Sequence, residues 1–151
     1  MAAFLAFLHH LAAFSLAGAV AIQFVLIRGE LSAENARRLS LADAVLGVSA
    51  LVVLIVGLLR VFYFEKGASY YFHNVAFIVK LSVFVVVALA SIYPTVQFAS
   101  WRKALKKGSV PAVAPGKLRA IRSVIHWELA GIVLILLCAA LMARGVGYFG
   151  G

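Results

Sequence analysis

Four basic side chains that fall inside or beside apolar stretches are the residues best placed to do chemistry. They are His10, Arg60, His73 and Lys80. An ammonium group in the interior of a bilayer costs roughly 2.5–3.5 kcal/mol on insertion scales, so Lys80 needs a partner or a route to water. A neutral imidazole binds metal ions, whereas ammonium and guanidinium groups bind anions. The four residues therefore predict a site for an anion, for a metal ion, or for a group that carries both.

Four apolar segments must position these residues, and each is long enough to cross a bilayer as a helix. The chain has 151 residues, is 65% hydrophobic and has a mean hydropathy of +1.07. A soluble domain of this size could not bury so much apolar surface. The segments cover about residues 3–27, 43–62, 75–98 and 124–143. Because the connections are short, we expect residues 1–151 to form a single all-α, polytopic membrane four-helix bundle.

The distribution of basic residues predicts the orientation of this bundle. Seven of the 14 Lys and Arg residues lie in segment 101–122, which contains no acid, and three more lie in segment 28–39. The positive-inside rule places both segments in the cytoplasm and both termini on the extracytoplasmic side. We interpret the charge as a topology signal and as contact with anionic membrane lipids, and we expect no nucleic-acid binding. The first apolar segment is too long for a signal peptide and has no preceding basic residue, so we expect a retained helix.

In this orientation the four basic residues form an outer layer together with His9. On the first helix, His10 shares a face with small residues, and His9 is rotated from it by about 100°. Small residues mark close helix contact in membranes, so we expect the His10 face to point into the bundle. That face comprises His10, Phe14, Ala17, Gly18, Ala21 and Arg28, whereas His9 lies with Leu5, Leu16 and Val20. On the third helix, His73 and Lys80 are two turns apart and share a face with Phe77, Val87 and Ser91.

The outer layer contains no acid at the same depth, since the nearest one, Glu65, lies in the external loop. A haem would supply iron for a histidine and propionates for Lys or Arg. We therefore expect haem b, with His10 as principal iron ligand, His73 as sixth ligand, and Arg60 and Lys80 near the carboxylates. Lys80 could instead snorkel to the interface, or lose its proton and act as a catalytic base. No C-x-x-C-H motif is present, which excludes a c-type haem.

A second, inner layer lies near the predicted cytoplasmic boundary and contains Arg28, Asp43, Gln97, His126 and Glu128. We expect Arg28 and Arg122 to neutralise the two carboxylates, and a proton relay is the alternative. Small residues recur on one face of the second helix, and Gly131 shares a face of the fourth with Glu128, Ile135 and Cys138. The small-residue stripes also predict a homo-oligomer.

Three blocks of the chain resemble an uncharacterised bacterial family of four-helix integral membrane proteins. The blocks are "LHHLAAFSLAG", "GLLRVFYFEKGASYYFHNVAFIVK" and "SIYPTVQFASWR". The resemblance runs along nearly the whole chain. It implies a multi-pass protein of the bacterial inner membrane and brings no assigned activity.

More distantly, the arrangement resembles the HemJ-type protoporphyrinogen IX oxidases, which are haem b-binding four-helix membrane proteins. That resemblance implies that His10 and Lys80 match an essential histidine and an essential lysine, and that Arg28 matches an arginine closing the first helix. The chain departs from the pattern at "VLIRGE", where the family has Leu-Pro-Arg-Leu, and at Phe77, where it has Trp. We expect haem b or porphyrin binding with oxidoreductase activity of this type. A small b-type cytochrome that exchanges electrons with quinones and a non-catalytic, lipid-binding scaffold are the alternatives.

Overall fold

A computed structural model describes residues 1–64 and 67–149 of the chain. Its four long helices are α1 (Ala2–Leu26), α2 (Ala33–Leu59), α4 (Val75–Ser100) and α6 (Pro115–Ala143). A π-helix, η1 (Arg60–Phe64), extends α2, and two short helices, α3 (Ala68–Phe72) and α5 (Arg102–Lys106), lie in the connections. The described part of the chain contains no strand. The predicted all-α class is confirmed.

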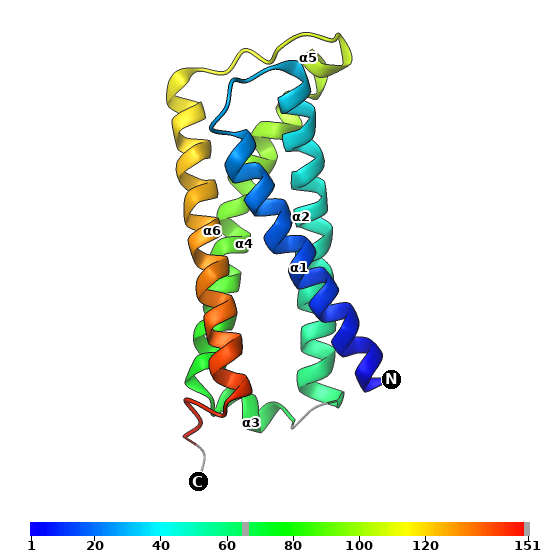
Figure 1. Ribbon diagram of the computed structural model, residues 1–151, viewed down its shortest axis with the longest axis vertical. Coiled ribbons are helices and arrows are strands. Elements are labelled where there is room, and N and C mark those ends of the chain that lie inside the picture. Colours follow the sequence, from blue (N-terminus) through cyan, green and yellow to red (C-terminus); the bar gives the residue numbers. More distant parts are fainter. Residues whose placement is uncertain (65–66, 150–151) are drawn as a thin grey trace.

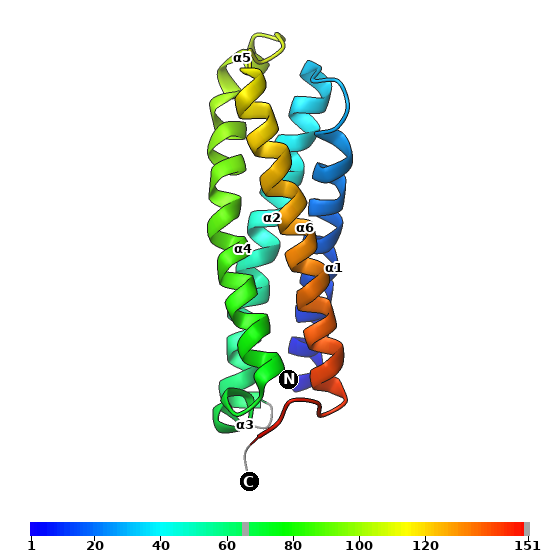
Figure 2. The same cartoon turned by 90° about the vertical axis from the view of Figure 1, so that its left-hand side faces the viewer.

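The four long helices form a bundle in which neighbours in sequence run antiparallel (Figures 1 and 2). The most extensive contacts join α1 to α2 and α4 to α6, and smaller ones join α1 to α6 and α2 to α4. All four helices are long and apolar enough to cross a membrane. The start of α1 and the end of α6 lie at the end of the bundle that carries α3, opposite α5 (Figure 1). The two termini therefore share one side, and its assignment to the outside stays a prediction.

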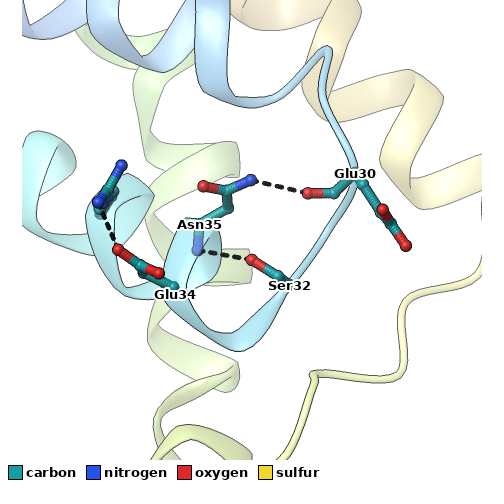
Figure 3. Close-up of polar contacts among 5 residues, drawn as sticks. Glu30, Ser32, Glu34 and Asn35 are labelled. Atoms are coloured by element: carbon teal, nitrogen blue, oxygen red, sulfur yellow. Dashed lines mark hydrogen bonds and ion pairs between the residues drawn. The ribbon is translucent and has the colours of Figure 1, made fainter.

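Two helices begin earlier than the apolar segments suggested. Helix α2 begins at Ala33 rather than near residue 43, because a capping motif starts it in the polar loop. Ser32 Oγ accepts a hydrogen bond from Asn35 N at 3.1 Å, and Asn35 Nδ2 donates to the Glu30 carbonyl at 2.9 Å (Figure 3). An ion pair between Glu34 and Arg38 stabilises the first turns.

Helix α6 likewise begins at Pro115 rather than near residue 124. Proline is favoured in the first turn of a helix, where its missing N–H would have no partner within the helix. Apolar length therefore predicted that these helices exist, whereas the Ser32 cap and the first-turn proline decide where they begin.

Two clusters of buried apolar residues fill the bundle. The first lies toward α5 and comprises Ile27, Ala36, Leu39, Phe98, Trp101, Leu105, Ile121 and Ile125. The second lies further along and comprises Leu16, Ala19, Val20, Leu46 and Ile132. Because lipid tails are as apolar as these side chains, close packing rather than removal from water stabilises the helix contacts. Neither cluster reaches the end that carries α3, where α1 and α6 diverge (Figure 1).

The inward face of α1 differs from the predicted one. Its buried residues are Ala12, Leu16, Ala19, Val20 and Gln23, which lie on the side of His9. Phe14 is 72% exposed, and Gly18 and Ala21 are exposed too, so the prediction that the His10 face points inward is wrong. Small residues permit close contact but do not enforce it in lipid, and larger core residues with Gln23 decide the rotation of α1. Phe77, which shares the predicted face of Lys80, is buried, and so are Glu128 and Cys138, which share a face of α6.

Candidate functional site

A cavity of about 420 Å³ lies between the four long helices near the end of the bundle that carries α3. Its wall is largely apolar, with Phe77 and Phe84 from α4 and with Ile135 and Met142 from α6. The volume is within the range of roughly 300–1,000 Å³ that is usual for small-molecule sites. Four basic residues share this wall: His9, His10, Arg60 and Lys80.

Lys80 lies half-buried in the cavity wall, with its Nζ atom 5.9 Å from the centre of the Phe77 ring. The face of an aromatic ring attracts an ammonium group. Arg60 acts on Lys80 as a like charge. None of the described residues that line the cavity is acidic, and Glu65, the acid expected nearest, lies outside the described residues. The ammonium charge of Lys80 is therefore not balanced by a described carboxylate of the wall.

Arg60 reaches the cavity from the point where α2 widens into η1. π-Helical turns are rare and are frequently found at functional sites. The short helix α3 closes the same end of the cavity with Tyr70 and Tyr71. The ring centres of Tyr71 and Phe77 are 5.2 Å apart, so the aromatic wall continues from α3 to α4.

His9 points from α1 toward α2. A Cβ atom placed on Gly57 would lie 3.1 Å from His9 Cε1 and 3.5 Å from His9 Nδ1, so the imidazole rests on the glycine backbone. Nδ1 is buried and makes no hydrogen bond of ordinary geometry with the described residues, although the backbone of Val53 is close. The small residue at position 57 thus makes room for a histidine ring.

His10 lines the cavity from an exposed position on α1. Its Nδ1 is 2.6 Å from the carbonyl oxygen of Ala6. Because a carbonyl only accepts, Nδ1 carries the proton, and the lone pair of the neutral ring is on Nε2. Histidines that bind metals commonly have this arrangement. The rings of His9 and His10 are 6.1 Å apart and nearly perpendicular, so two neighbours on one helix cannot reach one iron from opposite sides.

His73 lies outside the lining of the cavity. Its Nδ1 donates to the carbonyl of Ser69 at 2.7 Å, and its ring is 5.6 Å from that of Phe149. Over residues 1–64 and 67–149, no group of three or more His, Cys, Asp or Glu side chains could hold a metal ion. The structure therefore brings together His10, Arg60 and Lys80, adds His9, and leaves His73 apart.

The inner layer is also arranged differently from the prediction. The Arg28 guanidinium lies 3.9 Å from the centre of the Phe24 ring, and Arg122 Nε donates to the Ile27 carbonyl at 2.8 Å. Neither arginine forms an ion pair with Asp43 or Glu128, so the predicted neutralisation is wrong. The Arg28 guanidinium instead packs on Phe24 of the same helix, and Arg122 binds the backbone at the C-terminal end of α1.

Asp43 is held by residues that the sequence did not single out. Its Oδ1 accepts hydrogen bonds from Thr95 Oγ1 at 2.9 Å and from Gln23 Nε2 at 3.4 Å. Gln23 is completely buried. A glutamine within the apolar run of the first helix was the available signal, because a buried amide in a membrane needs a polar partner on another helix.

Comparison with protein families identifies the chain's relatives. A family described as "Predicted membrane protein (DUF2214)" matches residues 1–147. The chain belongs to this family. It is a multi-pass membrane protein with four candidate spans, as the first resemblance implied. No curated protein and no solved structure matches the chain, so none supports the resemblance to HemJ-type oxidases. The family description carries no activity, and function must be inferred from the site.

Proposed function

We propose that the protein binds an amphipathic anion in the cavity at the α3 end, and that this guest is haem b or a related porphyrin. The observation that carries the proposal is that Lys80 shares an apolar wall with two histidines, has Arg60 near it as a like charge, and has no described acid of the wall to balance it. Like charges in a poorly solvated site repel one another, and a bound carboxylate relieves that repulsion. An apolar guest with acidic groups at one edge would pack against the apolar side chains of the wall and pair with its basic side chains.

The residues of the cavity fit a haem with one histidine ligand. His10 offers Nε2, Phe77 and Phe84 offer flat apolar surfaces, and Lys80 and Arg60 offer cations for propionates. When bound, a haem would supply a redox-active iron. The other histidine of the wall, His9, is pressed against α2. A site with a single histidine favours porphyrin chemistry over a six-coordinate cytochrome that only exchanges electrons with quinones.

Lys80 is the residue that we expect to hold the carboxylate of the guest. Lys80→Arg keeps the positive charge but removes an amine that can lose its proton, whereas Lys80→Met removes the charge at similar length. Met should weaken binding of the guest, and Arg should retain it. If Arg also abolishes turnover, Lys80 acts as a base. Wild-type binding and activity in both variants would mean that Lys80 only snorkels to the interface.

The test of haem binding is the Soret spectrum of the protein purified after expression with haem supplied. We expect a b-type spectrum that is lost or shifted in His10→Ala and retained in His73→Ala, the matched control outside the cavity. An unchanged spectrum in His10→Ala would remove His10 as ligand. Absence of a Soret band from the wild type would refute haem binding, and a colourless but functional protein would support the lipid-binding scaffold.

Two further assays separate the possible reactions. Rescue of a bacterial strain that lacks protoporphyrinogen oxidase tests the oxidase activity, with Lys80→Met as the negative control. Reduction of the bound haem by a quinol tests the cytochrome alternative. Rescue without reduction by quinol would support the oxidase, and the reverse result would support electron transfer.

We also infer that the protein lies in the bacterial inner membrane, with the α5 end in the cytoplasm, as a homo-oligomer. The basic segment around α5 and the loop between α1 and α2 lie at the same end of the bundle (Figure 1). This arrangement supports a common cytoplasmic side for both segments. Crosslinking in native membranes tests the homo-oligomer, and a monomer as the sole species would refute it.

A further inference from the structure

A layer of polar side chains crosses the inside of the bundle, and each long helix contributes one residue to it. The residues are Gln23 from α1, Asp43 from α2, Thr95 from α4 and Glu128 from α6. Asp43 accepts hydrogen bonds from Gln23 and Thr95, and it acts electrostatically on Glu128. None of the four lines the basic cavity, so the layer is a separate feature.

Apolar residues enclose this layer on both sides. About one turn toward α5, the first buried cluster contributes Ile27, Leu39 and Ile125 from the same three helices that carry Gln23, Asp43 and Glu128. About one turn toward α3, the second cluster contributes Val20, Leu46 and Ile132. Glu128 lies 13 residues after the start of α6, or about 20 Å along the helix axis. Thr95 is the one exposed residue of the four.

The buried oxygen atoms of the layer lack donors. Both carboxyl oxygens of Glu128 and Oε1 of Gln23 are buried without a hydrogen-bond partner, and the two residues are 1% and 0% exposed. A buried carboxylate without a compensating charge strongly destabilises a folded protein. The charged group that acts on Glu128 is Asp43, which has the same sign, while α1 and α4 present uncharged Gln23 and Thr95. The atoms without partners are all acceptors, and a cation is what would satisfy them together.

We propose that this layer binds one singly charged cation, a sodium ion or an exchangeable proton, between Asp43 and Glu128. Carboxylate, amide and hydroxyl oxygens are the ligands that hard cations prefer. Ionisable residues inside membrane bundles commonly mark ion or proton pathways. A sodium ion would exchange without any covalent change, whereas a proton would form an O–H bond on a carboxylate that breaks again when the proton leaves.

The experiment compares the full-length protein in detergent in sodium chloride and in choline chloride at equal ionic strength. Thermal unfolding reports sodium binding, and infrared difference spectroscopy over a pH series reports the carbonyl band of a protonated carboxylic acid. Glu128→Gln removes the charge while keeping the shape of the side chain. The matched control is Glu30→Gln, because Glu30 is exposed in the loop and uses only its backbone carbonyl to accept a bond from Asn35 (Figure 3).

If the cation is sodium, the unfolding temperature of the wild type should rise by about 5–10 °C at a sodium concentration a hundredfold above half-saturation. Glu128→Gln should abolish the rise and Glu30→Gln should keep it. If the cation is a proton, sodium should have no effect, and a carboxylic-acid band that titrates with pH should disappear in Glu128→Gln. Absence of both signals from the wild type, or their persistence in Glu128→Gln, would overturn the proposal.

A second variant keeps the test decisive if Glu128→Gln does not fold. Thr95→Val removes the hydroxyl group from the layer and preserves the shape of the side chain. It should shift the midpoint of the sodium or proton titration by about tenfold or more, which is the usual effect of one hydrogen bond to a charged group. An unchanged midpoint would overturn the proposal. These measurements do not involve the basic cavity, so their outcome is independent of haem binding.

Discussion

Replacing Gly131 with alanine should force α6 away from α4. A Cβ atom at position 131 would lie 2.5 Å from Val87 Cγ2 and 3.5 Å from Val83 Cγ1. A β-branched side chain in a helix has one strongly preferred rotamer, so Val87 cannot easily turn aside. The two helices form one of the two most extensive contacts in the bundle. The new methyl group must therefore distort the valine or separate the backbones.

The size of the effect follows from this overlap. Carbon atoms in contact normally lie about 3.5–4.0 Å apart, so the methyl group would intrude by about 1 Å. Overpacking of a core typically costs about 1–3 kcal/mol. Alanine also favours the helix over glycine by about 1 kcal/mol, which partly hides the steric cost. Gly47→Ala in α2 makes the same chemical change where nothing lies within 4 Å. The difference between the two variants isolates the steric cost of about 1–3 kcal/mol.

Thermal unfolding of the purified protein measures this difference, at roughly 2–4 °C per kcal/mol for a chain of this size. A Val87→Ala substitution in the Gly131→Ala background should recover part of the lost stability, since it removes the atom in the way. If Gly131→Ala and Gly47→Ala unfold at the same temperature, the close approach of α6 to Val87 is not present in the folded protein and the reasoning fails.

Three other substitutions test separate parts of the structure. In Gly57→Ala the new Cβ atom would lie 3.1 Å from the His9 ring. Pushing this ring away from its preferred rotamer should cost about 1 kcal/mol and weaken haem binding in the cavity about fivefold. Wild-type affinity in a haem titration would contradict this. Asn74→Ala removes the buried cap of α4 and the hydrogen bond to the Val146 carbonyl, which should lower the free energy of unfolding by about 1–2 kcal/mol. The loss should exceed that of Ser32→Ala at the half-buried cap of α2, and an equal or smaller loss would contradict this prediction. A cysteine introduced at Val110, in a variant without the native cysteine, should react with a membrane-impermeant reagent only from the cytoplasmic side, and labelling from the outside would reverse the topology.

Composition and the spacing of apolar segments were sufficient to predict the four spans. Helical spacing also placed Glu128 and Cys138 on one face of the fourth helix, and both are buried. Lys80 and Arg60 were expected in one layer, and both line the cavity. These features depend on local periodicity and on depth in the bilayer, which a single sequence carries.

The rotation of α1 could not be predicted in the same way. His9 and His10 are adjacent, and small residues lie on the His10 side, yet the packing of Leu16 and Val20 against α2 and α6 turns the His9 side inward. The fit of His9 against Gly57 joins residues on two helices, and no periodicity within either helix reveals it. The same applies to Thr95, whose bond to Asp43 exists only after α2 and α4 meet. Contacts between helices were the missing information.

The pairing of α1 with α2 and of α4 with α6 has a consequence for how the protein is made. Each pair is a hairpin of helices that follow one another in the chain, and the N-terminal hairpin leaves the ribosome first. During that interval Asp43 has Gln23 beside it, but Thr95 and Glu128 have not yet been synthesised. A half-assembled molecule therefore presents a carboxyl group with part of its hydrogen bonding missing. Docking of the second hairpin supplies the Thr95 hydroxyl as a further donor to Asp43, and this bond favours correct pairing of the two halves.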